Sequence, residues 1–193
     1  IAVGIQPIPL SAQLTQNELE NLCKVVEPDA VAIDPTLAFP TKNEITQIQL
    51  DELQEMRALP AVSYTMGDKD RLAYLVFTSG TSGRPKAVMH AHRAVWARQM
   101  MIRDWYDLHE SDRLLHAGAF NWTYTLGTGL LDPWSVGATA LIPSSDTRTE
   151  DIPKLLAEHQ ATIFAAAPGV YRRMLRASQF PSLPHLRHGL SAG

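Results

Sequence analysis

The feature that most constrains the fold is an alternation of short apolar runs and longer amphipathic segments, which begins at Leu72. An apolar run of about four to eight residues is typical of a strand that is buried on both faces of a sheet. Segments of about ten to fifteen residues between such strands are long enough for crossover helices, which join parallel strands. The sequence therefore predicts an α/β fold with a mainly parallel sheet and crossover helices. The predicted strands span residues 72–78, 87–90, 112–117, 138–143, 161–167 and 186–191, and the predicted helices span residues 91–106, 125–136, 149–159 and 168–177.

The N-terminal third of the chain carries the same alternation in a weaker form. Residues 1–10 are apolar but contain two prolines, which is typical of an edge strand or an irregular strand. Thr15 and Glu18 have the spacing of a capping box and predict that a helix begins here, and residues 29–34 are typical of a short buried strand. We therefore expect two incomplete subdomains of one larger domain, residues 1–66 and residues 67–193.

Composition excludes several classes of protein. The 193 residues carry a net charge of -3 without any run of Lys and Arg, so we expect neither nucleic acid nor an anionic membrane surface as a partner. No stretch approaches the roughly 18 consecutive apolar residues of a membrane span, and the N-terminus lacks the charged start of a signal peptide. The single cysteine, Cys23, allows no internal disulfide, so we expect a cytoplasmic location. Both ends lie within apolar runs, from which we expect an internal piece of a longer protein.

The segment 78–86, at the end of a predicted buried strand, has a composition that fits either a solvent-exposed Gly/Ser/Pro connection or a triphosphate-binding loop. Glycines let backbone N–H groups approach phosphate oxygens, hydroxyls add donors that can also coordinate Mg²⁺, and a lysine adds a point charge. Arg84 and Pro85 separate the last glycine from the lysine, so the spacing is not that of the Walker motif, and no Gly-x-Gly-x-x-Gly fingerprint occurs. The residues concerned are Thr78, Ser79, Gly80, Thr81, Ser82, Gly83 and Lys86.

This segment resembles the phosphate-binding signature of the adenylate-forming superfamily, which includes acyl-CoA synthetases, luciferases and peptide-synthetase adenylation domains. The resemblance covers residues 78–88 together with His90 and His92. Ser82 replaces the usual threonine and keeps its hydroxyl, whereas Ala87 replaces the usual glycine and adds a Cβ to the turn. The resemblance implies that the loop residues bind the β- and γ-phosphates of ATP. It also implies catalytic roles for Lys86 and Thr81, with Mg²⁺ at Thr81.

A second segment, residues 121–142, resembles the acyl pocket of benzoate-type aryl-CoA ligases. Aromatic residues at these spacings are ordinarily core residues. The resemblance instead implies that Tyr124 lies against the substrate carboxylate and the α-phosphate. The small residues Gly127 and Thr128 would set the depth of the pocket, and Thr125, which replaces a glycine, would narrow it. We therefore expect the substrate residues Tyr124, Thr125, Gly127 and Thr128.

The last residues, 187–193, resemble the strand that enters the adenine-contacting turn of the same superfamily, which implies that Ala192 and Gly193 abut the adenine. The expected protein is thus part of the N-terminal domain of an ATP-dependent acid–CoA ligase. Its substrates would be a small carboxylic acid, ATP and CoA. Several motifs of the superfamily do not occur in these 193 residues, so we expect the isolated chain to be inactive.

Two other functions remain open from the sequence, a carrier-protein loading adenylation domain and a stand-alone nucleotide-binding module without catalysis. Residues 189–193 also fit the Gly-x-Ser-x-Gly elbow of serine hydrolases. That elbow requires a following helix and then an acid and a histidine, and these 193 residues contain none of them after Gly193. His90 and His92 could share a strand face, but a third metal ligand is not nearby in the sequence.

Overall fold

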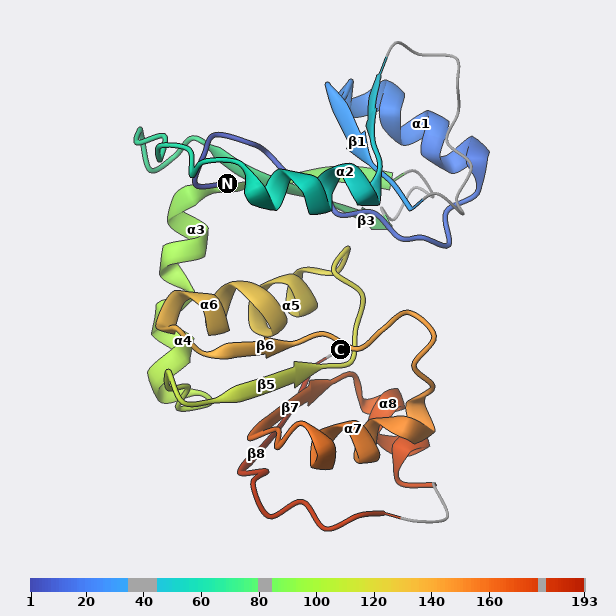
Figure 1. Cartoon of the computed structure of the whole chain (residues 1–193), viewed down its shortest axis with the longest axis vertical. Coiled ribbons are helices and arrows are strands. Elements are labelled where there is room, and N and C mark those ends of the chain that lie inside the picture. Colours follow the sequence, from blue (N-terminus) through green and yellow to red (C-terminus); the bar gives the residue numbers. More distant parts are fainter. Residues whose placement is uncertain (35–44, 80–84, 177–179, 193) are drawn as a thin grey trace. The chain divides into compact units, whose positions relative to one another are not determined.

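The computed structural model describes residues 1–34, 45–79, 85–176 and 180–192, which are drawn in colour in Figure 1. Contacts between residues divide the chain into two compact units, Ile1–His90 and Ala91–Gly193. This division lies later than the predicted subdomain boundary after residue 66. The reason is that the strand beginning at Leu72 is joined to the N-terminal segment, because the N–H of Leu75 donates to the carbonyl of Pro7 at 3.2 Å.

In the first unit, helix α1 (Gln16–Val26) begins where the capping box predicted. The N–H of Glu18 donates to the Thr15 hydroxyl at 3.3 Å, and the N–H of Thr15 donates to the Glu18 carboxylate at 2.8 Å. These two bonds satisfy amide groups that a helix start leaves without partners. The inner face of α1 buries Leu22 and Cys23.

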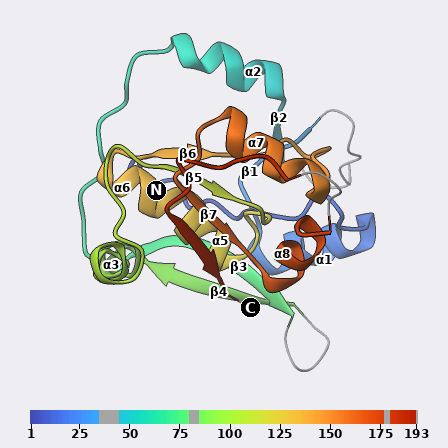
Figure 2. The same cartoon turned by 90° about the horizontal axis from the view of Figure 1, so that it is seen from below.

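Two small sheets complete the first unit. Strand β1 (Ala30–Ala32) pairs in parallel with β2 (Thr46–Ile48). Strand β3 (Leu72–Ser79) pairs with β4 (Pro85–Ala91), and Figure 2 shows these two strands side by side. Between β2 and β3 lie the short polar helix α2 (Leu50–Glu55) and the 3-10 turn η1 (Met56–Ala58).

The second unit is built on a four-stranded parallel sheet with the strand order β6-β5-β7-β8 (Figure 1). In its register, Leu114 lies opposite Ala140 of β6 and Ile163 of β7, and Phe164 lies opposite Gly189 of β8. This sheet confirms the predicted α/β fold with mainly parallel strands. The strands are β5 (Arg113–His116), β6 (Thr139–Leu141), β7 (Ile163–Ala166) and β8 (His188–Ser191).

Two of the predicted helices in this unit are interrupted. The segment 91–106 forms α3 (His92–Ala97) and α4 (Gln99–Asp104), which are separated at Arg98. Pro133 is tolerated in the segment 125–136 because it lies in the first turn of a new helix, where its missing N–H has no role. The segment contains α5 (Thr123–Leu126), the π-helical stretch η2 (Gly127–Leu131) and α6 (Asp132–Val136), and it is followed along the chain by the 3-10 turn η3 (Thr149–Asp151), α7 (Ile152–Glu158) and α8 (Pro168–Met174).

Helices cover both faces of this sheet. Neighbouring residues of a strand point to opposite faces, so Leu114 and Leu115 of β5 enter different cores. Leu114 packs with Ile102 of α4 in one core, which Tyr124 and Val136 also contact. Leu115 packs in the other core with residues of α7 and α8. Within the described residues, no helix is long and apolar enough to cross a membrane.

A polar network closes the amino ends of β5, β7 and β8. The Asp112 side chain, which precedes β5, accepts hydrogen bonds from the Thr162 hydroxyl at 2.6 Å and from Arg187 Nε at 3.1 Å. Burial raises the pKa of the Asp112 carboxyl. The hydrogen bonds from Arg187 and Thr162 outweigh this effect and hold the pKa below its usual value. The polar groups at the amino ends of these strands are therefore occupied by hydrogen bonds to one another. Ligands of such sheets bind at the opposite, carboxyl ends of the strands.

Candidate functional site

The predicted site residues fall into three groups along the structure. Those of the phosphate segment that can be described belong to the first unit, and those of the acid and adenine sites belong to the second. Thr78 and Ser79 end β3, Lys86 lies near the start of β4, Tyr124 and Thr125 lie in α5, Gly127 and Thr128 lie in η2, and Ala192 follows β8. The predicted site residues Gly80, Thr81, Ser82, Gly83 and Gly193 lie outside the described residues.

Thr78 and Lys86 mark one end of the β3–β4 sheet. The two strands pair and are joined by residues 80–84, so the end of β3 and the start of β4 share an edge. The side chains of Thr78 and Lys86 are both exposed. An exposed hydroxyl and an exposed ammonium group at a sheet edge can bind phosphate oxygens without loss of ladder hydrogen bonds.

Behind this edge, Tyr74 of β3 and His90 of β4 stack with ring centroids 4.5 Å apart and an interplanar angle of 7°. The Nε2 atom of His90 is buried and has no hydrogen-bond partner among the described residues. Burial lowers the pKa of His90, which favours the neutral ring. In the part of the chain that the structure describes, no three His, Cys, Asp or Glu side chains come together as metal ligands. His90 therefore packs against Tyr74 within the β3–β4 sheet.

In the second unit, Tyr124 lies near the carboxyl end of β5 within a group of aromatic rings. Its ring meets the ring of His116 edge-on with centroids 4.6 Å apart, and meets Trp122 in the same way at 5.3 Å. The His116 side chain is buried, with 3% of its surface exposed. Burial raises the pKa of Tyr124 to about 12 and lowers the pKa of His116 to about 4. Both side chains are therefore neutral at pH 7.

His116, Tyr124 and Thr125 form a buried polar cluster, which we call the His116 cluster. Both ring nitrogens of His116 and the hydroxyls of Tyr124 and Thr125 lack a hydrogen-bond partner among the described residues. Two glycines leave space for it: a Cβ at Gly118 would lie 2.3 Å from Thr125 Oγ1, and a Cβ at Gly129 would lie 2.7 Å from His116 Cβ. Buried polar groups are ordinarily paired, so such a concentration of unpaired groups requires an explanation.

Gly127 and Thr128 lie beside a buried ion pair. Arg98 donates to the Asp132 carboxylate from Nε at 2.7 Å and from Nη2 at 2.6 Å, and its Nη2 also donates to the Thr128 hydroxyl at 3.1 Å. The Tyr106 hydroxyl donates to the same carboxylate at 2.5 Å. A Cβ at Gly127 would lie 2.2 Å from Arg98 Cζ, so the guanidinium needs a glycine here. The role of Gly127 and Thr128 in setting pocket depth stays a prediction.

Near the predicted adenine contact at Ala192, Tyr171 of α8 holds the last two strands together. Its hydroxyl lies 2.9 Å from the carbonyl oxygen of Phe164 in β7 and 3.0 Å from that of Leu190 in β8, and shares its one proton between them. Burial raises the pKa of Tyr171 to about 12, so the hydroxyl stays protonated and remains a donor. This contact fixes the strand that leads to Ala192.

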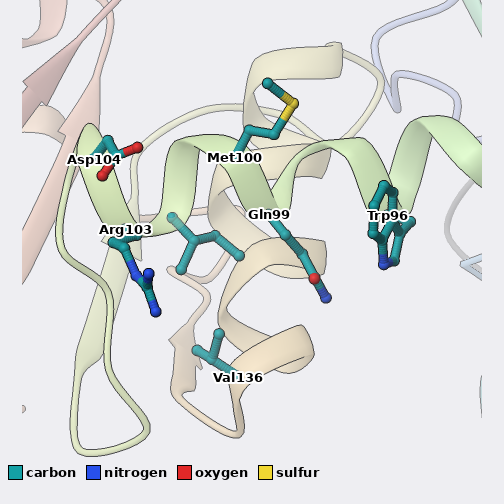
Figure 3. Close-up of a pocket in the computed structure, with 7 residues that line it drawn as sticks. Trp96, Gln99, Met100, Arg103, Asp104 and Val136 are labelled. Carbon is teal, nitrogen blue, oxygen red and sulfur yellow. The ribbon is translucent and has the colours of Figure 1, made fainter.

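A separate pocket of about 490 Å³ lies along α3 and α4 (Figure 3). Figure 3 shows Gln99 and Arg103 on the side of the helix that faces Val136 of α6. None of the predicted site residues lines this pocket, and we assign no chemistry to it. Its lining residues are Trp96, Gln99, Met100, Ile102, Arg103, Asp104 and Val136.

Sequence reasoning missed His116, Arg98 and Tyr171. His116 had a detectable signal, because it is a polar residue between the apolar residues Leu114, Leu115 and Ala117 of a predicted strand. Arg98 and Asp132 are separated by 34 positions, and no local pattern joins them. Tyr171 fits the apolar face of a helix, where a tyrosine looks like any other core residue.

These features define the class of the molecule, an α/β protein with polar groups at the carboxyl edge of a parallel sheet and a hydroxyl-rich segment between two paired strands. The sequence pattern of the AMP-binding enzyme family matches residues 1–193, and the chain belongs to this family. The resemblance to adenylate-forming enzymes is thereby confirmed.

Three similar proteins show where the chain stands within the family. It is 34% identical over 126 residues to a 3-hydroxybenzoate–CoA/4-hydroxybenzoate–CoA ligase from Thauera aromatica, a match that covers 64% of this chain and 24% of the relative. A benzoate CoA ligase from Burkholderia xenovorans LB400 has the same fold, with a TM-score of 0.85 at 24% identity over 98% of this chain and 41% of that chain. ATP-bound MatB from Rhodopseudomonas palustris gives a TM-score of 0.80 at 25% identity over 95% of this chain and 39% of that one. The chain thus spans about a quarter to two fifths of the length of these proteins.

Proposed function

We propose that the protein containing this chain is an AMP-forming acid–CoA ligase. The observation that carries the proposal is the pairing of β3 with β4, which sets Thr78 and Lys86 at one end of a small sheet. Between them lie the glycines and hydroxyls of residues 80–84. In a member of the AMP-binding enzyme family, this combination of donors suits a triphosphate.

The proposed reaction has two steps. A carboxylate oxygen of the acid bonds to the α-phosphorus of ATP, the bond from that phosphorus to the bridging oxygen breaks, and pyrophosphate leaves. The sulfur of CoA then bonds to the acyl carbon, the thiol proton is lost and AMP leaves. Both steps require stabilised charge and aligned reactants at a phosphoryl or acyl centre.

Each predicted residue has a role in this proposal. Lys86 and the hydroxyls of Thr78 and Ser79 bind the β- and γ-phosphates, together with Gly80, Thr81, Ser82 and Gly83. Tyr124 walls the acid and the α-phosphate, and Ala192 and Gly193 abut the adenine. The Thr81 hydroxyl would hold the Mg²⁺ that accompanies ATP, because hard oxygen ligands suit this ion. The Mg²⁺ would neutralise part of the phosphate charge.

We propose an aryl acid as the substrate class. The aromatic rings of Trp122 and Tyr124 at the carboxyl end of β5 offer flat apolar surfaces on which a ring can pack. The relative from Thauera aromatica is named for hydroxybenzoates and the structural neighbour from Burkholderia xenovorans for benzoate, which supports this choice and CoA as the acceptor. A cytoplasmic location belongs to the same proposal.

The test is acid-dependent exchange of pyrophosphate into ATP by the protein encoded by the full reading frame. The acid panel contains benzoates, cyclohexane carboxylate, and short and medium fatty acids. We expect exchange with aryl acids, and a loss of at least about 100-fold in the Lys86→Ala variant, because one charge-stabilising donor contributes about that much to a rate. The matched control is Lys154→Ala, which removes an exposed lysine of α7.

Other outcomes discriminate between the alternatives. Exchange with an aryl acid but no thioester with CoA would favour a carrier-protein loading domain. A folded protein that binds ATP without exchange for any acid would contradict catalysis and favour a binding module.

A further inference from the structure

The His116 cluster differs from the other buried polar groups in the second unit. The carboxylates of Asp112 and Asp132 each accept hydrogen bonds from several donors, and the Thr128 hydroxyl accepts one from Arg98. The polar atoms of the His116 cluster have no such partners among the described residues. A buried polar group without a partner costs free energy, so a histidine and a threonine here are poor choices for a purely structural core.

The backbone around the cluster is adapted to it. A Cβ at Gly118 would collide with Thr125, and a Cβ at Gly129 would collide with His116. The two glycines therefore leave the space that these two polar side chains occupy. An apolar residue at position 116 would pack between these strands and helices without an unpaired group. The cluster therefore has the chemistry of a recognition site.

The hydrogen-bonding capacity of the cluster defines what it can recognise. The His116 ring is neutral at pH 7 because burial lowers its pKa to about 4, so one ring nitrogen donates and the other accepts. The hydroxyls of Tyr124 and Thr125 can each donate and accept. The best match is a small group that also does both, such as a hydroxyl, whereas a carboxylate only accepts and an ammonium only donates.

The cluster also lies near a surface that a ligand can approach. Trp122 is 38% exposed and contacts Tyr124, which in turn contacts His116. Ring contacts therefore link the exposed Trp122 to His116 through Tyr124, and side-chain rotamer changes are common when a ligand binds.

We propose that His116, together with Tyr124 and Thr125, binds a hydroxyl group carried by the ring of the aryl acid, and so selects a hydroxylated acid over an unsubstituted one. This inference rests on the proposed ligase function and deepens it. It adds His116 as a specificity-determining residue beside the residues predicted from the sequence.

The experiment compares acids that differ only in hydrogen bonding. The probes are 3- and 4-hydroxybenzoate, the corresponding methylbenzoates and benzoate, and the readout is kcat/KM of ATP–pyrophosphate exchange by the full-length protein. We expect one hydroxybenzoate to be favoured over its methyl isostere by at least about 100-fold, because a site built for a hydroxyl strongly rejects analogues that lack it. The His116→Phe variant should reduce this ratio to less than about tenfold, mainly by raising KM for the hydroxylated acid. The His116→Gln variant keeps a donor and an acceptor and should retain part of the ratio.

The matched control is His185→Phe, which changes an exposed histidine and should leave the ratio as in the unmodified protein. Equal use of hydroxyl and methyl acids by the unmodified protein would overturn the inference even if no variant folds, and would point to a buried water as the partner of the cluster. An unchanged ratio in His116→Phe would also overturn it. Exchange with fatty acids alone would contradict the inference and the aryl class but leave the ligase function. No exchange with any acid would contradict the ligase function itself.

Discussion

At the scale of single residues, the structure depends on how buried charges are paired. The Asp132 side chain is 2% exposed, and its carboxylate accepts hydrogen bonds from Arg98 and from the Tyr106 hydroxyl. A buried carboxylate that loses its cation keeps its desolvation cost without compensation. The pair therefore holds the junction of α3 and α4 against η2 and α6.

The Arg98→Met variant should lower the free energy of unfolding by about 3 kcal/mol, because it leaves Asp132 buried without its cation. Urea unfolding followed by tryptophan fluorescence measures this change. Arg148→Met is the control, since Arg148 pairs with Asp151 on the exposed surface and its loss should leave the midpoint unchanged. Equal unfolding midpoints for the two variants would show that the buried Arg98–Asp132 pair contributes no more to the free energy of unfolding than the exposed Arg148–Asp151 pair.

His116 should make stability depend on pH. Burial lowers its pKa from 6.5 to about 4, so above pH 6.5 the ring is neutral whether the protein is folded or unfolded. As the pH falls from 6.5 toward 4, the unfolded state takes up a proton that the folded state refuses, and stability falls by about 1 kcal/mol per pH unit. The difference in unfolding free energy between the unmodified protein and His116→Phe, measured from pH 7 to pH 4, isolates this contribution from that of the carboxylates. A difference that stays constant over this range would contradict a buried neutral histidine.

At the scale of secondary-structure elements, the carboxyl edge of the sheet is held by a helix as well as by strand pairing. Tyr171 of α8 reaches the carbonyls of Phe164 in β7 and Leu190 in β8. It therefore joins two neighbouring strands through one hydroxyl, and Leu190 lies two positions before the predicted adenine contact at Ala192.

The Tyr171→Phe variant should destabilise this edge by about 1 kcal/mol, the usual net contribution of a buried hydrogen bond. The effect should be local, so amides of β7 and β8 should exchange faster in native-state hydrogen exchange while those of α1 keep their rates. Tyr64→Phe removes a hydroxyl from a tyrosine that is 77% exposed and serves as the control. Unchanged exchange in β8 would show that strand pairing alone holds this edge.

At the scale of the whole molecule, the chain provides two α/β units of an AMP-binding enzyme, and it spans 41% of the benzoate CoA ligase whose fold it shares. An adenylating enzyme must align the acid, the triphosphate and the adenine at once, and rates fall steeply when reactants are misaligned. Several motifs of the adenylate-forming superfamily do not occur in these 193 residues, and we expect such an alignment to need them.

We therefore expect the isolated 193-residue chain to show no acid-dependent ATP–pyrophosphate exchange under conditions in which the full-length protein is active. Circular dichroism of the isolated chain serves as the control for folding. Acid-dependent exchange by the isolated chain would contradict this expectation, and would show that residues 1–193 contain a complete adenylation site.

The sequence by itself determined the fold class and the order of strands and helices from Leu72 onward, and it predicts the phosphate segment. These follow from local physics: apolar runs predict β5 and β7, the Thr15–Glu18 spacing predicts the start of α1, and glycines beside hydroxyls and a lysine predict a phosphate loop. The interruption at Arg98 was not predicted, because residues 91–106 contain neither glycine nor proline. Gly127, Gly129 and Pro133 lower the helix propensity of the second segment, but propensity does not indicate that the segment becomes π-helical.

Only the tertiary structure decided which polar groups meet. The packing of α3–α6 on one face of the sheet brings Arg98 into an ion pair with Asp132. It also brings Tyr124 and Thr125 beside His116. Arg98 and Asp132 are 34 positions apart, His116 lies on a strand whereas Tyr124 and Thr125 lie on a helix, and periodicity within one element carries no information about contacts between elements. The proposed selection of the acid therefore rests on a cluster that the sequence pattern alone does not reveal, since burial and the lack of hydrogen-bond partners among the described residues are properties of the folded chain.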